Sequence, residues 1–192
     1  KRIEEAAAGK KVRKFDVSCA YKDSDELEKM LAETLPEDRV IDPILLFGKS
    51  IHREIESLFD PERVEALRRK LAKAKQTAGL VILYGCGSAC AALHDCADVT
   101  AFLDVTPLSA TTRVQAGRVR ALGDAKERPL PYLFRRLYYY DYEIMMLHRK
   151  DLIARGDVDF YIDSNLEDNL KLLPLAACRE LLAIQTSYPF LC

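Results

Sequence analysis

The stretch Leu80-Val81-Ile82-Leu83-Tyr84-Gly85-Cys86-Gly87-Ser88-Ala89 decides the fold class of this chain. Its apolar run predicts a buried strand, and its two glycines predict a tight turn that leads into a helix. In α/β proteins such a junction binds phosphate, because the free N–H groups and the dipole of the helix N-terminus both favour an anion. We therefore expect Gly85, Cys86, Gly87 and Ser88 to be candidate phosphate- or nucleotide-binding residues.

The same stretch lacks the residues of a working phosphate loop. That motif, Gly-x-x-x-x-Gly-Lys-Ser/Thr, uses its lysine to reach the outer phosphates and its hydroxyl to hold magnesium. Here the first lysine or arginine after the turn is Arg113. The tripeptide Gly48-Lys49-Ser50 matches the end of the motif, but Pro43 stands where the first glycine is needed. The sequence thus predicts the scaffold of a nucleotide kinase without its chemistry.

The composition is that of an ordinary globular protein. The 192 residues, 49% of them hydrophobic and 31% charged, suit one α/β domain. A formal net charge of −1 gives no general attraction to nucleic acid or to an anionic membrane. No apolar run approaches the roughly 20 residues that span a bilayer. The six cysteines are not spaced as a disulfide framework, so we expect a reducing, cytoplasmic environment.

The two ends predict that residues 1–192 are a single α/β domain cut from a longer chain. The chain begins with Lys1 and not with methionine, and residues 1–14 are charged enough to form a flexible lead-in. It stops on the apolar segment 188–192, whereas native C-termini are usually solvated.

Strands and helices alternate along the sequence. Helices are expected over residues 61–79, 89–96, 107–115, 142–154 and 174–183, and from an N-cap at Ser24. Strands are expected over residues 40–47, 80–84, 99–105, 133–140 and 158–162. This alternation is typical of a mostly parallel sheet with helices on both faces. We therefore predict a P-loop kinase-like three-layer α/β sandwich.

Aspartates follow several of the predicted strands. Ligands of an open parallel sheet bind beyond the carboxyl ends of its strands, where Asp104, Asp141 and Asp163 would lie. A carboxylate at that edge can hold magnesium or act as a base toward a hydroxyl, although turns and caps use the same residue type. Asp104 and Asp141 are therefore the candidate catalytic residues.

Arg136 and Arg149 are candidate phosphate ligands. The pair Arg135-Arg136 precedes the tyrosine-rich run 138–142, and Arg149 lies on the next predicted helix. Guanidinium groups bind phosphate through paired hydrogen bonds, but a solvated helix face explains Arg149 equally well. Alternating tyrosines on a strand would direct one face to the core and the other to solvent or a partner.

A metal site is not expected in this domain. Cys86, Cys90, His94 and Cys96 do not follow the spacing of structural zinc sites, which place ligand pairs on a turn and add a second pair elsewhere. These thiols are expected to pack as small apolar residues. No cofactor is predicted.

Residues 59–89 resemble the N-terminal nucleoside-kinase-like domain of long class I mannose-6-phosphate isomerases. The resemblance continues through 102–104, 135–141, 148–150 and 160–163. It implies a parent protein that interconverts mannose 6-phosphate and fructose 6-phosphate in a C-terminal cupin domain, where the family binds its zinc. That cupin domain and a nucleotide or sugar phosphate are the implied partners. The family's zinc ligands and sugar-phosphate residues have no counterpart in this chain.

Three hypotheses for function follow. The first is an accessory kinase-like domain of a mannose-6-phosphate isomerase, without catalysis of its own. The second is a nucleotide-dependent nucleoside or sugar kinase that uses the glycine turn, Asp104 and arginines of the 113–136 region. The third is a protein-interaction module that docks through the tyrosine-rich segment.

Overall fold

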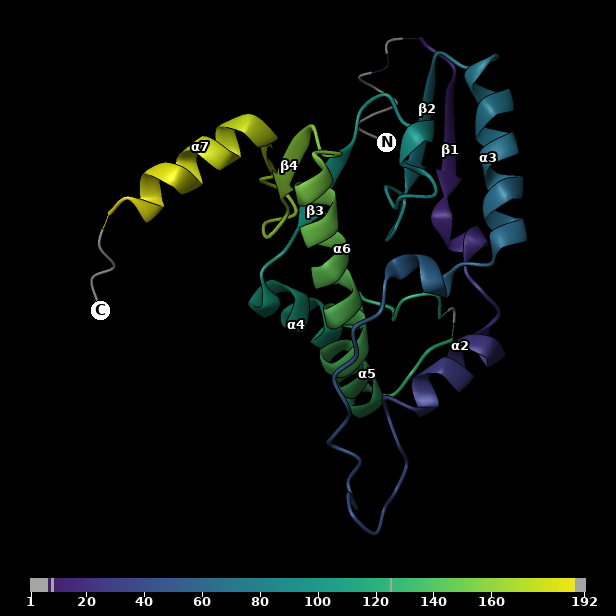
Figure 1. Ribbon diagram of the computed structural model, residues 1–192, viewed down its shortest axis with the longest axis vertical. Helices are drawn as coiled ribbons and strands as arrows, with labels where there is room; N and C mark the ends of the chain where they lie inside the picture. The colour runs from purple at the N-terminus through teal and green to yellow at the C-terminus, as the bar shows by residue number, and fades with distance from the viewer. Residues whose placement is uncertain (1–6, 8, 125, 189–192) are drawn as a thin grey trace.

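The computed structural model describes residues 7, 9–124 and 126–188. Two small sheets lie among helices, with α3 beside the first sheet and α6 near the middle of the molecule (Figure 1). The chain is a mixed α/β protein, as the sequence predicts. Within the described residues, no helix is both long enough and apolar enough to cross a membrane.

The first sheet joins two distant segments. Strand β1 (Val12–Asp16) runs parallel to β2 (Leu80–Tyr84), with Val12 opposite Leu80. The expected strand at 80–84 is therefore confirmed, but its predicted burial is wrong, because Leu80 and Tyr84 are exposed and the three residues between them are only partly buried in this two-stranded sheet. The prediction of a flexible lead-in over 1–14 is wrong for residues 12–14, because their backbone groups pair with β2; residues 1–6 and 8 lie outside the described part.

Helix α3 (Pro61–Lys75) precedes β2 in the chain and begins as its sequence predicts. The Asp60 carboxylate accepts hydrogen bonds from the N–H groups of Glu62 and Arg63 at 2.9 and 3.0 Å. Pro61 at the first helical position lacks an N–H that would otherwise need a partner. The buried face of α3 carries Val64, Leu67, Leu71 and Ala74.

The second sheet contains three strands. Strand β3 (Ala101–Asp104) is parallel to β4 (Phe160–Asp163), and β5 (Lys171–Pro174) is antiparallel to β4. The strands expected at 99–105 and 158–162 are confirmed with shifted ends. Strand β5 is not predicted from the sequence, where Pro174 is taken as the first residue of the helix over 174–183.

The other helices are α2 (Ser24–Ala32), α4 (Pro107–Gln115), α5 (Leu130–Arg136), α6 (Tyr142–Arg155) and α7 (Leu175–Thr186). Short 3-10 helices occupy Val17–Ala20, Ile55–Leu58 and His94–Cys96. The predicted α4 and α6 are confirmed, and Gly156 ends α6 in the left-handed conformation at φ +79°. The cap of α2 is Asp23 and not Ser24.

A π-helical segment, Leu137–Asp141, joins α5 to α6. The strand expected over 133–140 is therefore wrong. Aromatic residues favour strands locally, but the buried positions Leu133, Arg136, Tyr140 and Ile144 recur every three or four residues. That spacing places them on one helical face, and burial of this face decides the conformation.

Two further expected elements are absent. Residues 40–47 form turns and irregular loop instead of a strand, and Val40 and Ile41 are almost fully exposed. Pro43 cannot donate to a ladder, which weakens a strand at this place. Residues 89–93 form turns, so the helix expected over 89–96 is replaced by the 3-10 turn at its end.

The main core lies between α3, the 3-10 segment 55–58 and the start of α6. Its most buried apolar side chains are Val17, Ile55, Leu58, Leu67, Leu93, Tyr140 and Ile144. A smaller cluster, Leu152, Val158 and Leu175, holds the base of α7 against α6 and β4.

Candidate functional site

The glycine turn after β2 is packed against the core. Gly85 and Gly87 have φ angles of +112° and +85°, which favour glycine. A Cβ atom built on Gly87 would lie 2.7 Å from Cζ of Phe59 and 2.9 Å from Cδ1 of Ile55. The space beside this glycine is thus filled by core side chains.

The backbone of the turn is also occupied. The N–H of Ser88 donates to the Gly85 carbonyl at 3.2 Å, and the N–H of Cys90 donates to the Gly87 carbonyl at 3.0 Å. The Tyr21 hydroxyl donates to the Cys86 carbonyl at 3.0 Å. No α-helix begins here, so the helix dipole that made the turn a candidate anion site is missing. Phosphate binding by Gly85, Cys86, Gly87 and Ser88 stays a prediction.

Arg136 and Asp141 meet inside the protein. The Arg136 guanidinium donates from Nε to Oδ1 of Asp141 at 3.4 Å and from Nη1 to Oδ2 of Asp124 at 3.1 Å. Its third nitrogen donates to the Leu122 carbonyl. The side chains of Arg136 and Asp141 are 2% and 4% exposed. All three guanidinium nitrogens therefore have partners within the protein.

Burial is the largest influence on the pKa of Asp141. Desolvation raises its pKa from 3.8 to about 6, although Arg136 and the Leu122 N–H, which donates to Oδ2 at 3.0 Å, both favour the charged form. A pKa near 6 suits a general base. The carboxylate, however, lies in the interior between Arg136 and Leu122, where it organises the chain around residues 122–141.

Asp104 and Arg149 also come together, and at the surface. Oδ2 of Asp104 accepts from Nη1 of Arg149 at 2.9 Å and from the Tyr161 hydroxyl at 2.6 Å, while Oδ1 accepts from the Val105 N–H at 2.9 Å. The Arg149 side chain is 43% exposed. Burial, followed by the hydrogen bond to Asp104, raises the pKa of Tyr161 and keeps its proton on the hydroxyl.

The carboxyl ends of β3 and β4 extend this polar cluster. The Ser164 hydroxyl donates to the Asp104 carbonyl at 3.0 Å, and Arg113 donates to the Ser164 carbonyl. The Asn165 side-chain oxygen accepts from the N–H and the hydroxyl of Thr106 at 2.8 and 2.9 Å. Asp104, Arg149, Tyr161, Ser164, Asn165 and Thr106 are called the strand-end cluster below.

Sequence reasoning found only part of this cluster. Nothing local marks Tyr161, Thr106, Ser164 or Asn165 as neighbours of Asp104, so the sequence alone did not identify them. The available signal was that β3 and β4 end in aspartates at matching register, Asp104 opposite Asp163. Asp163 itself accepts from the N–H and the side-chain amide of Asn165 at 2.9 and 2.6 Å, which is turn chemistry.

The strand-end cluster contains one half-exposed cationic group, the Arg149 guanidinium, that could bind an anion. Arg149 presents a half-exposed guanidinium, a group that binds phosphate through paired hydrogen bonds, but its Nη1 already donates to the Asp104 carboxylate, which repels an anion. Throughout residues 7, 9–124 and 126–188, no three His, Cys, Asp or Glu side chains are grouped closely enough to hold a metal ion.

A second exposed feature is apolar. Helix α7 extends away from the rest of the molecule, beyond β4 (Figure 1). Leucine and isoleucine side chains on α7 and around β5 are about half exposed or more: Leu170, Leu172, Leu181, Leu182 and Ile184. Exposed apolar side chains are also found where a protein contacts another protein or domain. We call these five residues the α7–β5 face.

The fold and its clusters define a mixed α/β domain. The family model described as Domain of unknown function (DUF8485) matches residues 1–187, and the chain belongs to that family. Searches of the curated proteins and of the solved structures found no match.

Proposed function

We propose that this chain is an accessory domain of a mannose-6-phosphate isomerase, with a P-loop kinase-like three-layer frame and no phosphoryl transfer of its own. The isomerase part of the proposal rests on the resemblance of residues 59–89 and the later matching segments. The frame is supported by the parallel pairs β1–β2 and β3–β4.

The packing of the glycine turn at Gly87 is the observation that supports a domain without catalysis of its own. Phe59 and Ile55 fill the side of the turn at Gly87, and the turn N–H groups of Ser88 and Cys90 bond within the turn. A phosphate would need those donors and a nearby cation. Arg136, the buried candidate, already donates to Asp124, Asp141 and Leu122.

The role that remains for the domain is to pack against another domain, and the exposed α7–β5 face supports this role. Leu172, Leu181 and Leu182 are 56%, 50% and 56% exposed. Covering such side chains stabilises an interface by about 25 cal/mol for each Å² of apolar surface removed from water. We assign this face to the cupin domain of the same protein, which would also bind the zinc.

An experiment on the whole protein tests the assignment. The protein that contains this chain should interconvert mannose 6-phosphate and fructose 6-phosphate, and the 192-residue chain alone should not. Leu182→Asp should lower the melting temperature of the whole protein while leaving that of the isolated chain unchanged, because Leu182 is exposed there. Glu180→Gln, on the same helix, is the matched control. A whole protein without isomerase activity would refute the proposal.

A small-molecule kinase is the second candidate, and the strand-end cluster favours it. Asp104 and Arg149 lie at the carboxyl ends of parallel strands, where α/β enzymes bind ligands. Calorimetric titration with MgATP separates the two candidates. The accessory proposal predicts no ATP hydrolysis, and an absence of binding heat would exclude the kinase. Micromolar binding that Arg149→Ala abolishes and Arg69→Ala preserves would favour the kinase, since both arginines are exposed and neither substitution disturbs the core.

A further inference from the structure

The loop between α2 and α3 exposes apolar side chains to an unusual degree. Val40, Ile41 and Ile44 are 93%, 82% and 73% exposed, and Leu46 and Phe47 are 57% and 62% exposed. In Figure 1 this loop reaches out from the end of the molecule farthest from α3. We call residues 40–47 the apolar loop. Several apolar residues side by side in water are unfavourable for an isolated protein and mark contact surfaces.

The backbone of the apolar loop is held in place. The Asp42 carboxylate accepts from the Phe47 N–H at 2.7 Å, within the loop itself. From α5, Arg135 donates to the carbonyls of Phe47 and Pro36 at 2.5 and 2.7 Å. The buried guanidinium therefore fixes the base of the loop, while its apolar side chains stay exposed.

The packing at Gly48 and the backbone conformation of Leu45 also define the shape of the loop. A Cβ atom on Gly48 would lie 2.7 Å from the Tyr139 ring, so the chain passes directly over that ring. Leu45 has a left-handed φ of +52°, a conformation that costs a non-glycine residue on the order of 1 kcal/mol or more. The loop is thus shaped before it meets a partner, which lowers the entropy lost on binding.

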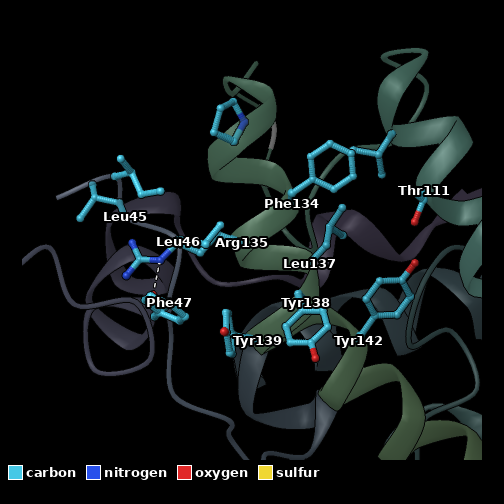
Figure 2. A pocket seen from close by; sticks show the side chains of 13 residues that line it. Leu45, Leu46, Phe47, Thr111, Phe134, Arg135, Leu137, Tyr138, Tyr139 and Tyr142 are labelled. Atoms are coloured by element: carbon cyan, nitrogen blue, oxygen red, sulfur yellow. Dashed lines mark hydrogen bonds between the residues drawn. The ribbon is translucent and has the colours of Figure 1, made fainter. Parts of the chain in front are cut away.

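A pocket adjoins the loop. Its volume is about 520 Å³, and its walls come from residues 44–47, α4, α5, the π-helical segment and the first residue of α6. Figure 2 shows the rings of Tyr138, Tyr139 and Tyr142 in a row along one wall, with Phe134 and Leu137 nearby. Among the described residues that line the pocket, Arg135 alone is charged, and its Nε and Nη2 donate to the carbonyls of Phe47 and Pro36. The pocket therefore suits an apolar occupant.

We propose that the apolar loop of one copy of this chain inserts into the pocket of a second copy, and the reverse, in a two-fold symmetric dimer. Loop and pocket lie on the same face, since residues 44–47 belong to both. An apolar protrusion beside an apolar hollow can pair with a second copy of itself about a two-fold axis, which closes the assembly at two copies. The formal net charge of −1 leaves little repulsion between copies. The proposal does not depend on the isomerase assignment.

The oligomeric state in solution tests this dimer. Sedimentation equilibrium of the wild-type chain should show a monomer–dimer equilibrium. Ile41→Asp in the loop and Tyr138→Asp at the pocket should each weaken dimerisation by roughly tenfold or more. Both residues are strongly exposed, at 82% and 69%, so each variant should keep the wild-type circular dichroism spectrum. Val99→Asp, at a 62% exposed apolar residue outside the pocket, is the matched control.

Mixing the two variants sharpens the test. A mixed dimer of the Ile41→Asp and Tyr138→Asp chains keeps one intact contact, between the wild-type loop of one copy and the wild-type pocket of the other. The mixture should therefore associate more tightly than either variant alone. A monomeric wild-type chain, a dimer that both variants leave intact, or a mixture no tighter than its components would each overturn the proposal.

Discussion

Arg136 and Asp141 form a buried ion pair, with Nε of the arginine 3.4 Å from Oδ1 of the aspartate. Both residues were candidates for ligand chemistry on sequence grounds. Their pairing, together with Asp124, instead ties the start of α6 to the irregular segment before α5. A buried charge without a partner is very costly, so the stability of this region depends on the pair.

The first prediction concerns Arg136→Met, which keeps an apolar stem and removes the charge. Asp141 would lose its cationic partner, and we expect a loss of about 3–5 kcal/mol in the free energy of unfolding. Urea denaturation measures it. Arg149→Met is the control, because its ion pair with Asp104 is half exposed and is worth about 0–1 kcal/mol. Equal losses in the two variants would contradict the buried pair.

The second prediction is a pH dependence specific to Asp141. Burial raises its folded-state pKa from 3.8 to about 6. Below about pH 4 the carboxyl is protonated in both states, and between about pH 4 and 6 only the folded state retains the proton. The stability from this group is thus present below about pH 4 and is lost as the pH rises through 6, on the order of 3 kcal/mol.

Comparison with Asp141→Asn isolates this effect. The stability of the wild type relative to the variant should fall between about pH 4 and 6, as measured by urea denaturation. Asp163→Asn provides a control of opposite sign. The N–H of Asn165 holds the pKa of Asp163 below its ordinary value, so the contribution of Asp163 is present at neutral pH and is lost as the pH falls. A pH-independent difference for Asp141→Asn would refute the raised pKa.

The third prediction concerns packing at the glycine turn. Gly87→Ala places a Cβ atom 2.7 Å from Phe59 in a backbone of φ +85°. Conformational strain costs about 1–2 kcal/mol, and overpacking adds about 1–3 kcal/mol. Gly117→Ala is the matched control, since its φ is +67° and no atom lies within 4 Å of the new Cβ. Thermal unfolding should show a larger loss for Gly87→Ala, and equal losses would mean that the turn is not packed as described.

The fourth prediction concerns the cap of α3. Asp60→Ala removes the acceptor for the N–H groups of Glu62 and Arg63 and should cost about 1 kcal/mol. Asp60→Asn retains an acceptor oxygen and should change the unfolding free energy by only a few tenths of a kcal/mol. If the asparagine variant loses as much stability as the alanine variant, the charge and not the cap is responsible.

Local signals predicted several elements well. The Asp60-Pro61 cap, the apolar run 80–84 and Gly156 each specify backbone geometry from neighbouring residues, and α3, β2 and the end of α6 follow them. The strand predicted over 133–140 is wrong, because strand preference there is a weak local term that burial on a helical face outweighs.

The candidate site depended more heavily on long-range contacts. Asp104 and Arg149 are 45 residues apart, and only the packing of α6 against β3 brings them together. Arg136 and Asp141 are close in sequence, yet their burial comes from elements that surround them. Sequence could identify the residue types and not their exposure, which decides whether a charged group binds a ligand or supports the fold.

Residues 80–89 show most clearly what the sequence alone determined and what only the tertiary structure decided. By itself the sequence determined a strand followed by glycines at positive φ, because apolar runs and the missing Cβ act locally. Only the tertiary structure decided what the turn does, because Phe59, Ile55 and Tyr21 reach it from distant segments and occupy its free side and the Cys86 carbonyl. In the folded protein, the junction that resembles a phosphate site packs against the core at Gly87, while Gly85 and Cys86 stay exposed.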